Sequence, residues 1–184
     1  ADTAMYSAKS AGRNGYRFYT PLMTDMTMQR LEIESALRQA LQQQQFSLHY
    51  QPQIDMFTDQ LLGAEALVRW QHPDKGLIRP DQFIPIAEES GLIVELGSWV
   101  LEEACRQYDQ WRKRGWKLPK LSVNVSVKQL ERGNLPQQLL QLQRKYDLPP
   151  NMLTLEITES VIMQKDYALT LLEEIAECGV ELAI

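Results

Sequence analysis

The chain has 184 residues and a formal net charge of −5, with 44% hydrophobic and 23% charged residues. These values are ordinary for one sizeable globular domain with a short appendage. The acidic balance argues against binding a nucleic-acid duplex, which calls for a basic footprint. The sequence contains no signal peptide and no run of about 20 apolar residues. We therefore expect a cytoplasmic segment without membrane contact of its own, although a longer parent protein could be membrane-anchored.

The sequence has only two cysteines, Cys105 and Cys178, and two histidines, His49 and His72. Each cysteine falls in a predicted helix beside apolar residues, which favours buried free thiols over a disulfide or a redox pair. So few nitrogen and sulfur ligands, at unrelated positions, predict no zinc site.

The N-terminal residues predict a helix over residues 1–11, ended by Gly12, and a short strand over residues 16–19. This segment is too short to form a core. A helix-favouring stretch over residues 23–45 is expected to connect it to the next domain. The resulting division is an N-terminal tail (1–20), a linker helix that starts the next domain (21–45), and the main domain (46–184).

Five later runs alternate between apolar and polar residues, which is the pattern of strands with one buried face. Helices are predicted over residues 81–90, 92–115, 135–146 and 167–178, and residues 72–82 are predicted to form a loop. The loop between the first two strands is too short for a parallel crossover, so these strands are expected to be antiparallel. The predicted strands are residues 46–53, 61–70, 121–127, 153–159 and 180–184.

Strands separated by helices argue for an α/β fold with largely parallel pairing. Strands that helices cover on both faces are usually apolar on both, but each run here keeps one polar face. A closed barrel explains this pattern, with helices outside and polar side chains inside. We therefore predict a (β/α)8 TIM-type barrel with an antiparallel first strand, of which about five strands are present. In such barrels active sites lie at the C-terminal ends of the strands.

The inward polar residues form one candidate site. Two carboxylates and an amide oxygen suit Mg²⁺ or Mn²⁺, while an arginine and a glutamine can bind phosphate and a base or sugar edge. That combination suits metal-assisted phosphodiester hydrolysis. In the structural alternative, Glu65 pairs with Arg69, and hydroxyl groups satisfy Asn124 and Glu156; the pattern alone does not separate the two hypotheses. We expect Gln51, Arg69, Asn124 and Glu156 toward the ends of their strands, Glu65 in mid-strand and Glu159 just past a strand end.

Several motifs occur in a characteristic order: Tyr50-Gln51-Pro52, Gly63-Ala64-Glu65-Ala66-Leu67-Val68-Arg69-Trp70, Phe83-Ile84-Pro85-Ile86-Ala87-Glu88, Asn124-Val125-Ser126 and Leu155-Glu156-Ile157-Thr158-Glu159. With these motifs, residues from about 30 to 184 closely resemble the first part of the EAL domain, the cyclic di-GMP phosphodiesterase family. The resemblance implies hydrolysis of cyclic di-GMP to the linear dinucleotide with two Mg²⁺ or Mn²⁺ ions. The alternatives are a catalytically inactive cyclic di-GMP receptor and a purely structural module that signals through dimer contacts.

The resemblance also implies roles for individual residues. Glu65, Asn124 and Glu156 would be metal ligands. Gln51, Leu67 and Arg69 would contact the dinucleotide. Glu159 would join Glu65 and Glu156 in the catalytic set by ordering a neighbouring loop.

Residues 1–19 resemble the closing helix and strand of the GGDEF (diguanylate cyclase) domain, through the pattern Ala-Asp-x-Ala-Met-Tyr-x-Ala-Lys-x-x-Gly-Arg-Asn, and carry none of the cyclase chemistry. In EAL enzymes a strand like residues 180–184 is followed by Asp-Asp-Phe-Gly and by further catalytic residues. We therefore expect this chain to be an inactive piece of a GGDEF–EAL parent. By analogy with EAL domains, the parent is expected to be a homodimer.

Overall fold

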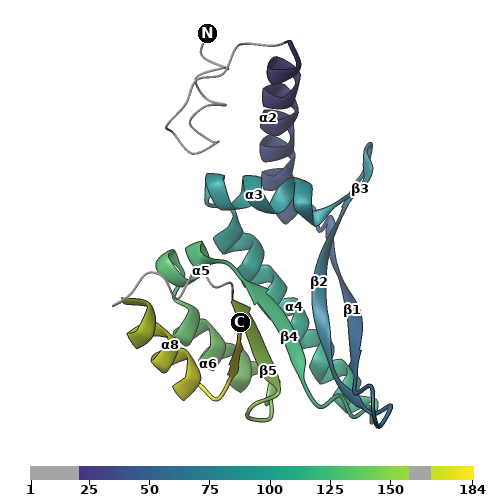
Figure 1. The fold of residues 1–184 in the computed structure, drawn as a ribbon, viewed down its shortest axis with the longest axis vertical. Coiled ribbons are helices and arrows are strands. Elements are labelled where there is room, and N and C mark those ends of the chain that lie inside the picture. The colour runs from purple at the N-terminus through teal and green to yellow at the C-terminus, as the bar shows by residue number, and fades with distance from the viewer. Residues whose placement is uncertain (1–20, 158–166) are drawn as a thin grey trace.

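The computed structural model of the chain describes residues 21–157 and 167–184 (Figure 1). Helix α2 (Pro21–Gln42) leads into a hairpin of β1 (Phe46–Ile54) and β2 (Leu61–His72), which the short strand β3 (Gly76–Ile78) follows. The later elements are α3 (Pro80–Ser90), α4 (Ile93–Lys113), β4 (Leu121–Val125), α5 (Val127–Arg132), α6 (Leu135–Tyr146), β5 (Leu153–Ile157), α8 (Tyr167–Glu177) and β6 (Glu181–Ala183).

The sheet runs in the order β1-β2-β4-β5-β6, and β3 pairs with β2 beside this path. The strands β2, β4, β5 and β6 are parallel to one another, whereas β1 is antiparallel to β2. The antiparallel pair is a consequence of the short connection between β1 and β2, because a parallel crossover needs a dozen or more residues. The predicted α/β fold is confirmed, and this arrangement is that of part of a TIM-type barrel.

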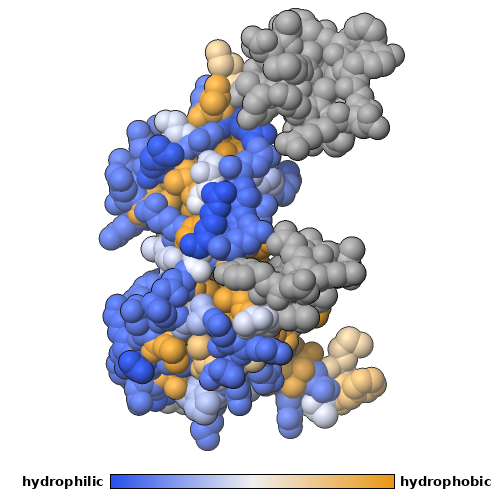
Figure 2. Space-filling model, turned by 90° about the vertical axis from the view of Figure 1, so that its left-hand side faces the viewer, coloured by the Kyte–Doolittle hydropathy of each residue, from blue (hydrophilic) through white to orange (hydrophobic). Residues whose placement is uncertain are grey.

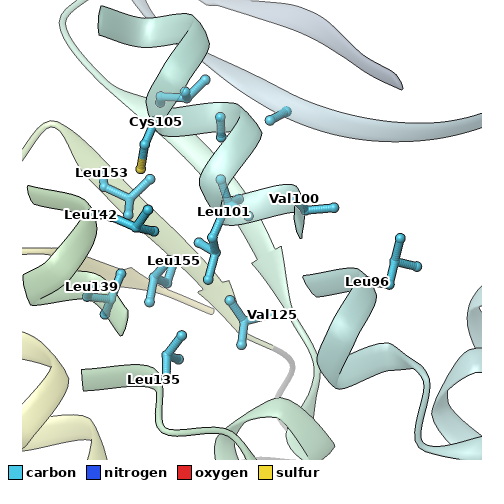
Figure 3. Packing of buried hydrophobic residues seen from close by; sticks show 14 of the residues in the cluster. Leu96, Val100, Leu101, Cys105, Val125, Leu135, Leu139, Leu142, Leu153 and Leu155 are labelled. Atoms are coloured by element: carbon cyan, nitrogen blue, oxygen red, sulfur yellow. The ribbon is translucent and has the colours of Figure 1, made fainter. Parts of the chain in front are cut away.

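The outward face of the central strands builds the hydrophobic core together with α4 and α6 (Figure 3). Leu121 and Val123 of β4 and Leu155 of β5 are fully buried. Leu101 and Cys105 of α4 belong to the same cluster and are equally buried. Because successive side chains of a strand point to opposite faces, this packing leaves the polar residues on the other side of the sheet.

Aromatic rings attach the second half of β2 to helix α3. Trp70 of β2 meets Phe83 of α3 edge-on, with ring centroids 5.5 Å apart, and Phe46 of β1 lies 5.6 Å from the Trp70 ring. The indole N–H of Trp70 donates a hydrogen bond to Gln45 Oε1 at 3.0 Å, so this buried polar atom is satisfied. The cluster fixes the direction of β2 beyond the point where it leaves β4.

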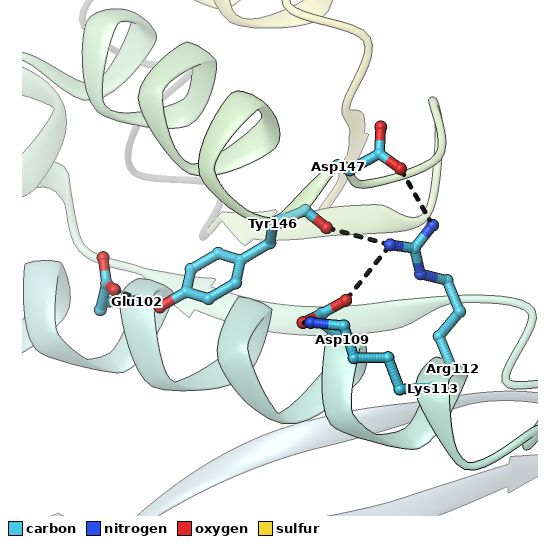
Figure 4. A network of polar contacts seen from close by, with 6 residues as sticks. All are labelled: Glu102, Asp109, Arg112, Lys113, Tyr146 and Asp147. Atoms are coloured by element: carbon cyan, nitrogen blue, oxygen red, sulfur yellow. Dashed lines mark hydrogen bonds and ion pairs between the residues drawn. The ribbon is translucent and has the colours of Figure 1, made fainter.

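A polar network joins α4 to α6 on the outside of the molecule (Figure 4). The buried Asp109 accepts hydrogen bonds from Lys113 at 2.5 Å and from Arg112 at 3.2 Å. Arg112 also donates to the backbone carbonyl of Tyr146, whose hydroxyl donates to Glu102. The hydrogen bond from Lys113, assisted by Arg112, holds the pKa of the Asp109 carboxyl below its ordinary value.

Two local predictions were wrong. Strand β4 ends at Val125 instead of continuing to residue 127, because Ser126 caps a helix. The Ser126 hydroxyl accepts from the backbone N–H of Gln129, and the Gln129 side chain accepts from the backbone N–H of Ser126. This capping box starts α5, a helix too short to show a hydrophobic period. The predicted loop over residues 72–82 contains β3, which pairs with the end of β2.

Both cysteines are buried and free, as predicted. Burial, with a smaller effect of the nearby Glu102, raises the pKa of the Cys105 thiol to about 12, so this thiol stays protonated. Among the described helices, none combines the length and apolar character needed to cross a bilayer. The predicted helix 1–11 and strand 16–19 lie outside the described residues.

Candidate functional site

Polar side chains of three neighbouring strands meet on the inner side of the sheet, opposite the helices. In the register of the sheet, Glu65 of β2 lies beside Ser122 of β4, and Asn124 of β4 lies beside Glu156 of β5. Residues two apart in a strand share a face, so Ser122 and Asn124 point the same way. The structure therefore brings Glu65, Asn124 and Glu156 together on one face of three adjacent parallel strands.

A hydrogen bond joins two of these side chains. Asn124 Nδ2 donates to Glu65 Oε1 at 2.7 Å. Asn124 is exposed, and both glutamates are half-buried. Within residues 21–157 and 167–184, the Glu156 carboxylate makes no hydrogen bond or ion pair to a side chain or backbone group. The site thus presents several oxygen atoms whose bonding capacity is unused.

Arg69 lies farther along the same face of β2, beyond Leu67. Its guanidinium donates to the backbone carbonyl of Val68 at 3.0 Å and forms no ion pair with a carboxylate of the described residues. The pairing of Glu65 with Arg69 that the structural alternative requires is therefore not observed. A half-buried guanidinium with free donors can bind an anion such as a phosphate oxygen.

The position of Gln51 needs a correction. Gln51 lies directly opposite Glu65 in the β1–β2 pair, and cross-strand partners have side chains on the same face. From the sequence, Gln51 and Arg69 were both expected toward the C-terminal ends of their strands, at the same end of the barrel. Because β1 is antiparallel, however, its C-terminal end meets the beginning of β2, and Ser47 is the residue opposite Arg69. Gln51 therefore neighbours the Glu65 carboxylate instead of the arginine.

A cavity opens where β2 separates from β4. Only residues 64–66 of β2 pair with β4, and the following part of β2 pairs with β1 and β3. The cavity has a volume of about 300 Å³ and lies between these strands and helices α3 and α4. Arg69, Asn124 and Glu156 line it together with apolar side chains that include Ile84 and Leu96. An apolar cavity with a few charged groups is the usual form of a small-molecule site.

The cavity wall includes Glu88, Ser126 and Gln129, to which the sequence analysis gave no role. Gln129 is buried and lies against α4 at Gly97, where an added Cβ would come within 1.8 Å of Gln129 Nε2. The absence of a side chain at Gly97 thus lets α5 approach α4. The Ser-x-x-Gln spacing of residues 126–129 is a capping-box signal that could have predicted α5.

The oxygen donors of Glu65, Asn124 and Glu156 fit a hard divalent cation by their chemistry and their common face. No group of three His, Cys, Asp or Glu side chains suited to a metal ion occurs within the described ranges. The described residues thus offer two carboxylates and one amide to a metal. Glu159 lies outside the described residues.

Comparisons with known proteins identify the family and the relatives of this chain. The profile of the EAL domain family matches residues 34–184. The bifunctional diguanylate cyclase/cyclic di-GMP phosphodiesterase MucR of Pseudomonas aeruginosa is 43% identical over 185 residues, which cover 100% of this chain and 27% of that protein. The cyclic di-GMP phosphodiesterase PdeR of Escherichia coli is 39% identical, over 98% of this chain and 27% of its own length. The chain thus spans about a quarter of these relatives.

Solved structures show the same fold. A structure described as the PaMucR phosphodiesterase in complex with c-di-GMP superimposes with a TM-score of 0.77 and 41% sequence identity. The match covers 83% of this chain and 62% of that one. The EAL enzyme Bd1971 in its cGMP-bound form gives a TM-score of 0.78 at 28% identity, over 88% of this chain and 45% of that one.

Proposed function

This chain belongs to the EAL domain family, and we propose that the protein carrying it hydrolyses cyclic di-GMP to the linear dinucleotide with Mg²⁺ or Mn²⁺. The observation that carries the proposal is the common face of Glu65, Asn124 and Glu156 beside the unpaired guanidinium of Arg69. Two curated relatives that cover nearly the whole chain are named cyclic di-GMP phosphodiesterases, which supports the same substrate.

Each side chain has a part in this proposal. Glu65, Asn124 and Glu156 hold the metal ions. When bound, divalent ions supply a nucleophilic water at neutral pH and neutralise the charge that grows on the phosphoryl oxygens. Arg69 grips a phosphate oxygen with its free N–H donors, and Leu67 offers an apolar contact to a base. Gln51, opposite Glu65, donates to the substrate or orients the carboxylate, and Glu159 supports the site by ordering a neighbouring loop.

A catalytically inactive cyclic di-GMP receptor is the second candidate. The cavity lined by Arg69, Asn124 and Glu156 would serve a receptor as well as an enzyme, whereas the presence of Glu65, Asn124 and Glu156 together argues for the enzyme. A receptor needs the cavity and Arg69 but no complete metal site. Both candidates predict dinucleotide binding, and only the first predicts turnover.

The test is a pair of measurements on the full-length protein. Calorimetry with cyclic di-GMP in Ca²⁺, chosen to slow hydrolysis, measures binding, and chromatographic detection of the linear dinucleotide in Mn²⁺ measures turnover. Arg69→Ala should weaken binding about tenfold or more, because it removes charge-assisted hydrogen bonds. Arg144→Ala removes an exposed cation from α6 and serves as the control. Binding without turnover would favour the receptor, and no binding would overturn both candidates.

The proposal extends to the context of the domain. We propose that residues 1–20 are the end of a GGDEF domain and residues 21–45 a linker helix, so that both domains of a GGDEF–EAL protein act on the same messenger. The match to MucR, which covers this chain from residue 1 to residue 184 and is to a protein named as a bifunctional enzyme, supports this arrangement. A cytoplasmic location and a homodimer complete the proposal, and light scattering of the full-length protein tests the dimer.

A further inference from the structure

Exposed apolar side chains concentrate at the end of the molecule where the β1–β2 hairpin turns. Phe57 is 96% exposed and Met56 is 89% exposed, more than the other large apolar side chains of the described residues. Hydrophilic residues cover most of the face that Figure 2 displays, with smaller hydrophobic patches between them. The other exposed apolar residues of the hairpin tip, which we define as residues 54–62, are Ile54, Leu61 and Leu62.

Hydrogen bonds hold the hairpin tip in a defined shape. The Asp55 carboxylate accepts from the backbone N–H groups of Phe57 and Thr58 at 2.8 and 2.9 Å. The backbone N–H of Asp55 donates to the carbonyl of Gln60, and that of Asp59 donates to the carbonyl of Asp55, both at 2.9 Å. Such an Asx-type turn fixes the backbone and projects Met56 and Phe57 outward. Their exposure is therefore a property of an ordered, convex turn.

An aromatic stack stands beside the hairpin at the C-terminal end of α4. Tyr50 of β1 meets Trp111 edge-on at 4.6 Å between ring centroids, and Trp116 stacks on Trp111 at 6.2 Å. Trp116 is 63% exposed. Figure 1 shows the end of α4 and the hairpin tip together at the lower end of the molecule. Tryptophan is enriched where an apolar medium meets water, because its ring is both apolar and polar.

Cations surround this tryptophan although the chain is acidic overall. Residues 112–120 contain five Lys and Arg side chains, and the chain carries a net charge of −5. Asp109 pairs with Arg112 and Lys113, and Lys120 pairs with Glu181. Arg114 and Lys117, on either side of Trp116, make no ion pair with a described residue. Asp59, exposed in the tip, is an opposing charge, whereas the Asp55 carboxylate is engaged in the turn.

We propose that the hairpin tip, together with Trp116, Arg114 and Lys117, docks on an anionic lipid bilayer. A convex apolar tip suits insertion among lipid headgroups, whereas a protein partner would require a matching groove. The free cations complement anionic headgroups. The candidate site lies farther along β2 toward its other end, so docking leaves the site open to a soluble ligand. This proposal is independent of the proposed function. It departs from the sequence-based expectation of no membrane contact, which depended on the lack of a signal peptide and of a spanning segment.

Vesicle flotation tests the proposal on the full 184-residue chain. Lipid-bound protein rises in a sucrose gradient, whereas aggregated protein sinks. We expect the chain to float with phosphatidylcholine vesicles containing 30% phosphatidylglycerol and to remain below with pure phosphatidylcholine. High salt should release it, because salt screens the attraction. Equal flotation with neutral vesicles would overturn the role of the cations, and no flotation with either would overturn lipid docking in favour of a protein partner.

Matched variants separate the apolar and the charged contributions. Met56→Ser/Phe57→Ser should lower the bound fraction about tenfold or more. The control Met28→Ser/Leu31→Ser removes two exposed apolar side chains from α2, 59% and 56% exposed, and should have no effect. Arg114→Glu/Lys117→Glu should lower binding to a similar degree. Asp59→Asn should strengthen it, and asparagine tolerates the φ of +53° at this position. Unchanged flotation of Met56→Ser/Phe57→Ser or of Arg114→Glu/Lys117→Glu would contradict the proposal.

Discussion

On the outer face of β4 and β5, Leu121, Val123 and Leu155 are fully buried against α4 and α6, whereas on the inner face Asn124 is exposed and Glu156 is half-buried. Both faces belong to the same five-residue strands. The outer side chains gain free energy by leaving water. The inner side chains stay accessible to water. Asn124 donates to Glu65, and the Glu156 carboxylate has no partner among the described residues, which leaves it free to bind a cation. A single strand can thus contribute one face to the hydrophobic core and the other face to a candidate binding site.

The largest expected effect is on the inner face alone. Replacing Glu65 by Gln keeps the shape of the side chain and removes a charge that would balance metal ions. Turnover of cyclic di-GMP by the full-length protein should fall about a thousandfold, or about 4 kcal/mol in the activation free energy. The melting temperature should stay within a degree or two, because Glu65 is not part of the core. Unchanged hydrolysis in Mn²⁺ would remove Glu65 from the proposed metal set.

The outer face should respond in the opposite way. Leu155→Ala leaves a cavity in the fully buried cluster and should lower the free energy of unfolding by about 3 kcal/mol. Urea denaturation followed by circular dichroism measures this loss. Leu140→Ala, at an exposed position of α6, is the matched control and should cost well under 1 kcal/mol. Similar losses at both positions would contradict the asymmetry between the faces.

The contact between α4 and α5 tests a position that belongs to both regions, because Gly97 and Gln129 lie between the core and the cavity. Gly97→Ala should destabilise by about 2 kcal/mol, since its Cβ would collide with Gln129. Helix propensity alone would predict a gain of about 1 kcal/mol for the same change. The double variant Gly97→Ala/Gln129→Ala removes the collision and should melt above the single variant. A single variant as stable as the wild type would show that Gln129 moves freely.

The smallest effect concerns the polar network of α4. Lys113 and Arg112 hold the pKa of Asp109 below its ordinary value, so the unfolded chain binds a proton at higher pH than the folded one. The stabilisation is therefore present at neutral pH and is lost as the pH falls through the folded-state pKa. Asp109→Asn should lower the melting temperature at pH 7, and the difference from wild type should shrink toward pH 3. Asp74→Asn removes an exposed carboxylate from the turn before β3 and serves as the control.

The alternation of apolar and polar residues predicted the strand faces and hence which residues make up the candidate site. Alternation in residues 61–70 and 121–125 separates Glu65, Arg69 and Asn124 from the apolar side chains, because the two-residue period of a strand is fixed by backbone geometry. The short loop before Leu61 likewise determined the antiparallel first pair. These features depend on local geometry, which a sequence pattern reports directly.

The relative positions of these side chains on different strands became known only from the folded structure. Alternation fixes the face of a side chain but leaves the register between strands open, and the antiparallel register places Gln51 opposite Glu65 instead of near Arg69. The separation of β2 from β4 depends on the packing of Trp70 against Phe83, and the cavity opens there. The capping box of residues 126–129 is a local signal for α5, but the close approach of α5 to α4 depends on the space that Gly97 leaves for Gln129, which is a contact between elements distant in sequence. The alternation of apolar and polar residues within a segment carries no information on contacts between segments distant in sequence. Such contacts are therefore seen only in the folded chain.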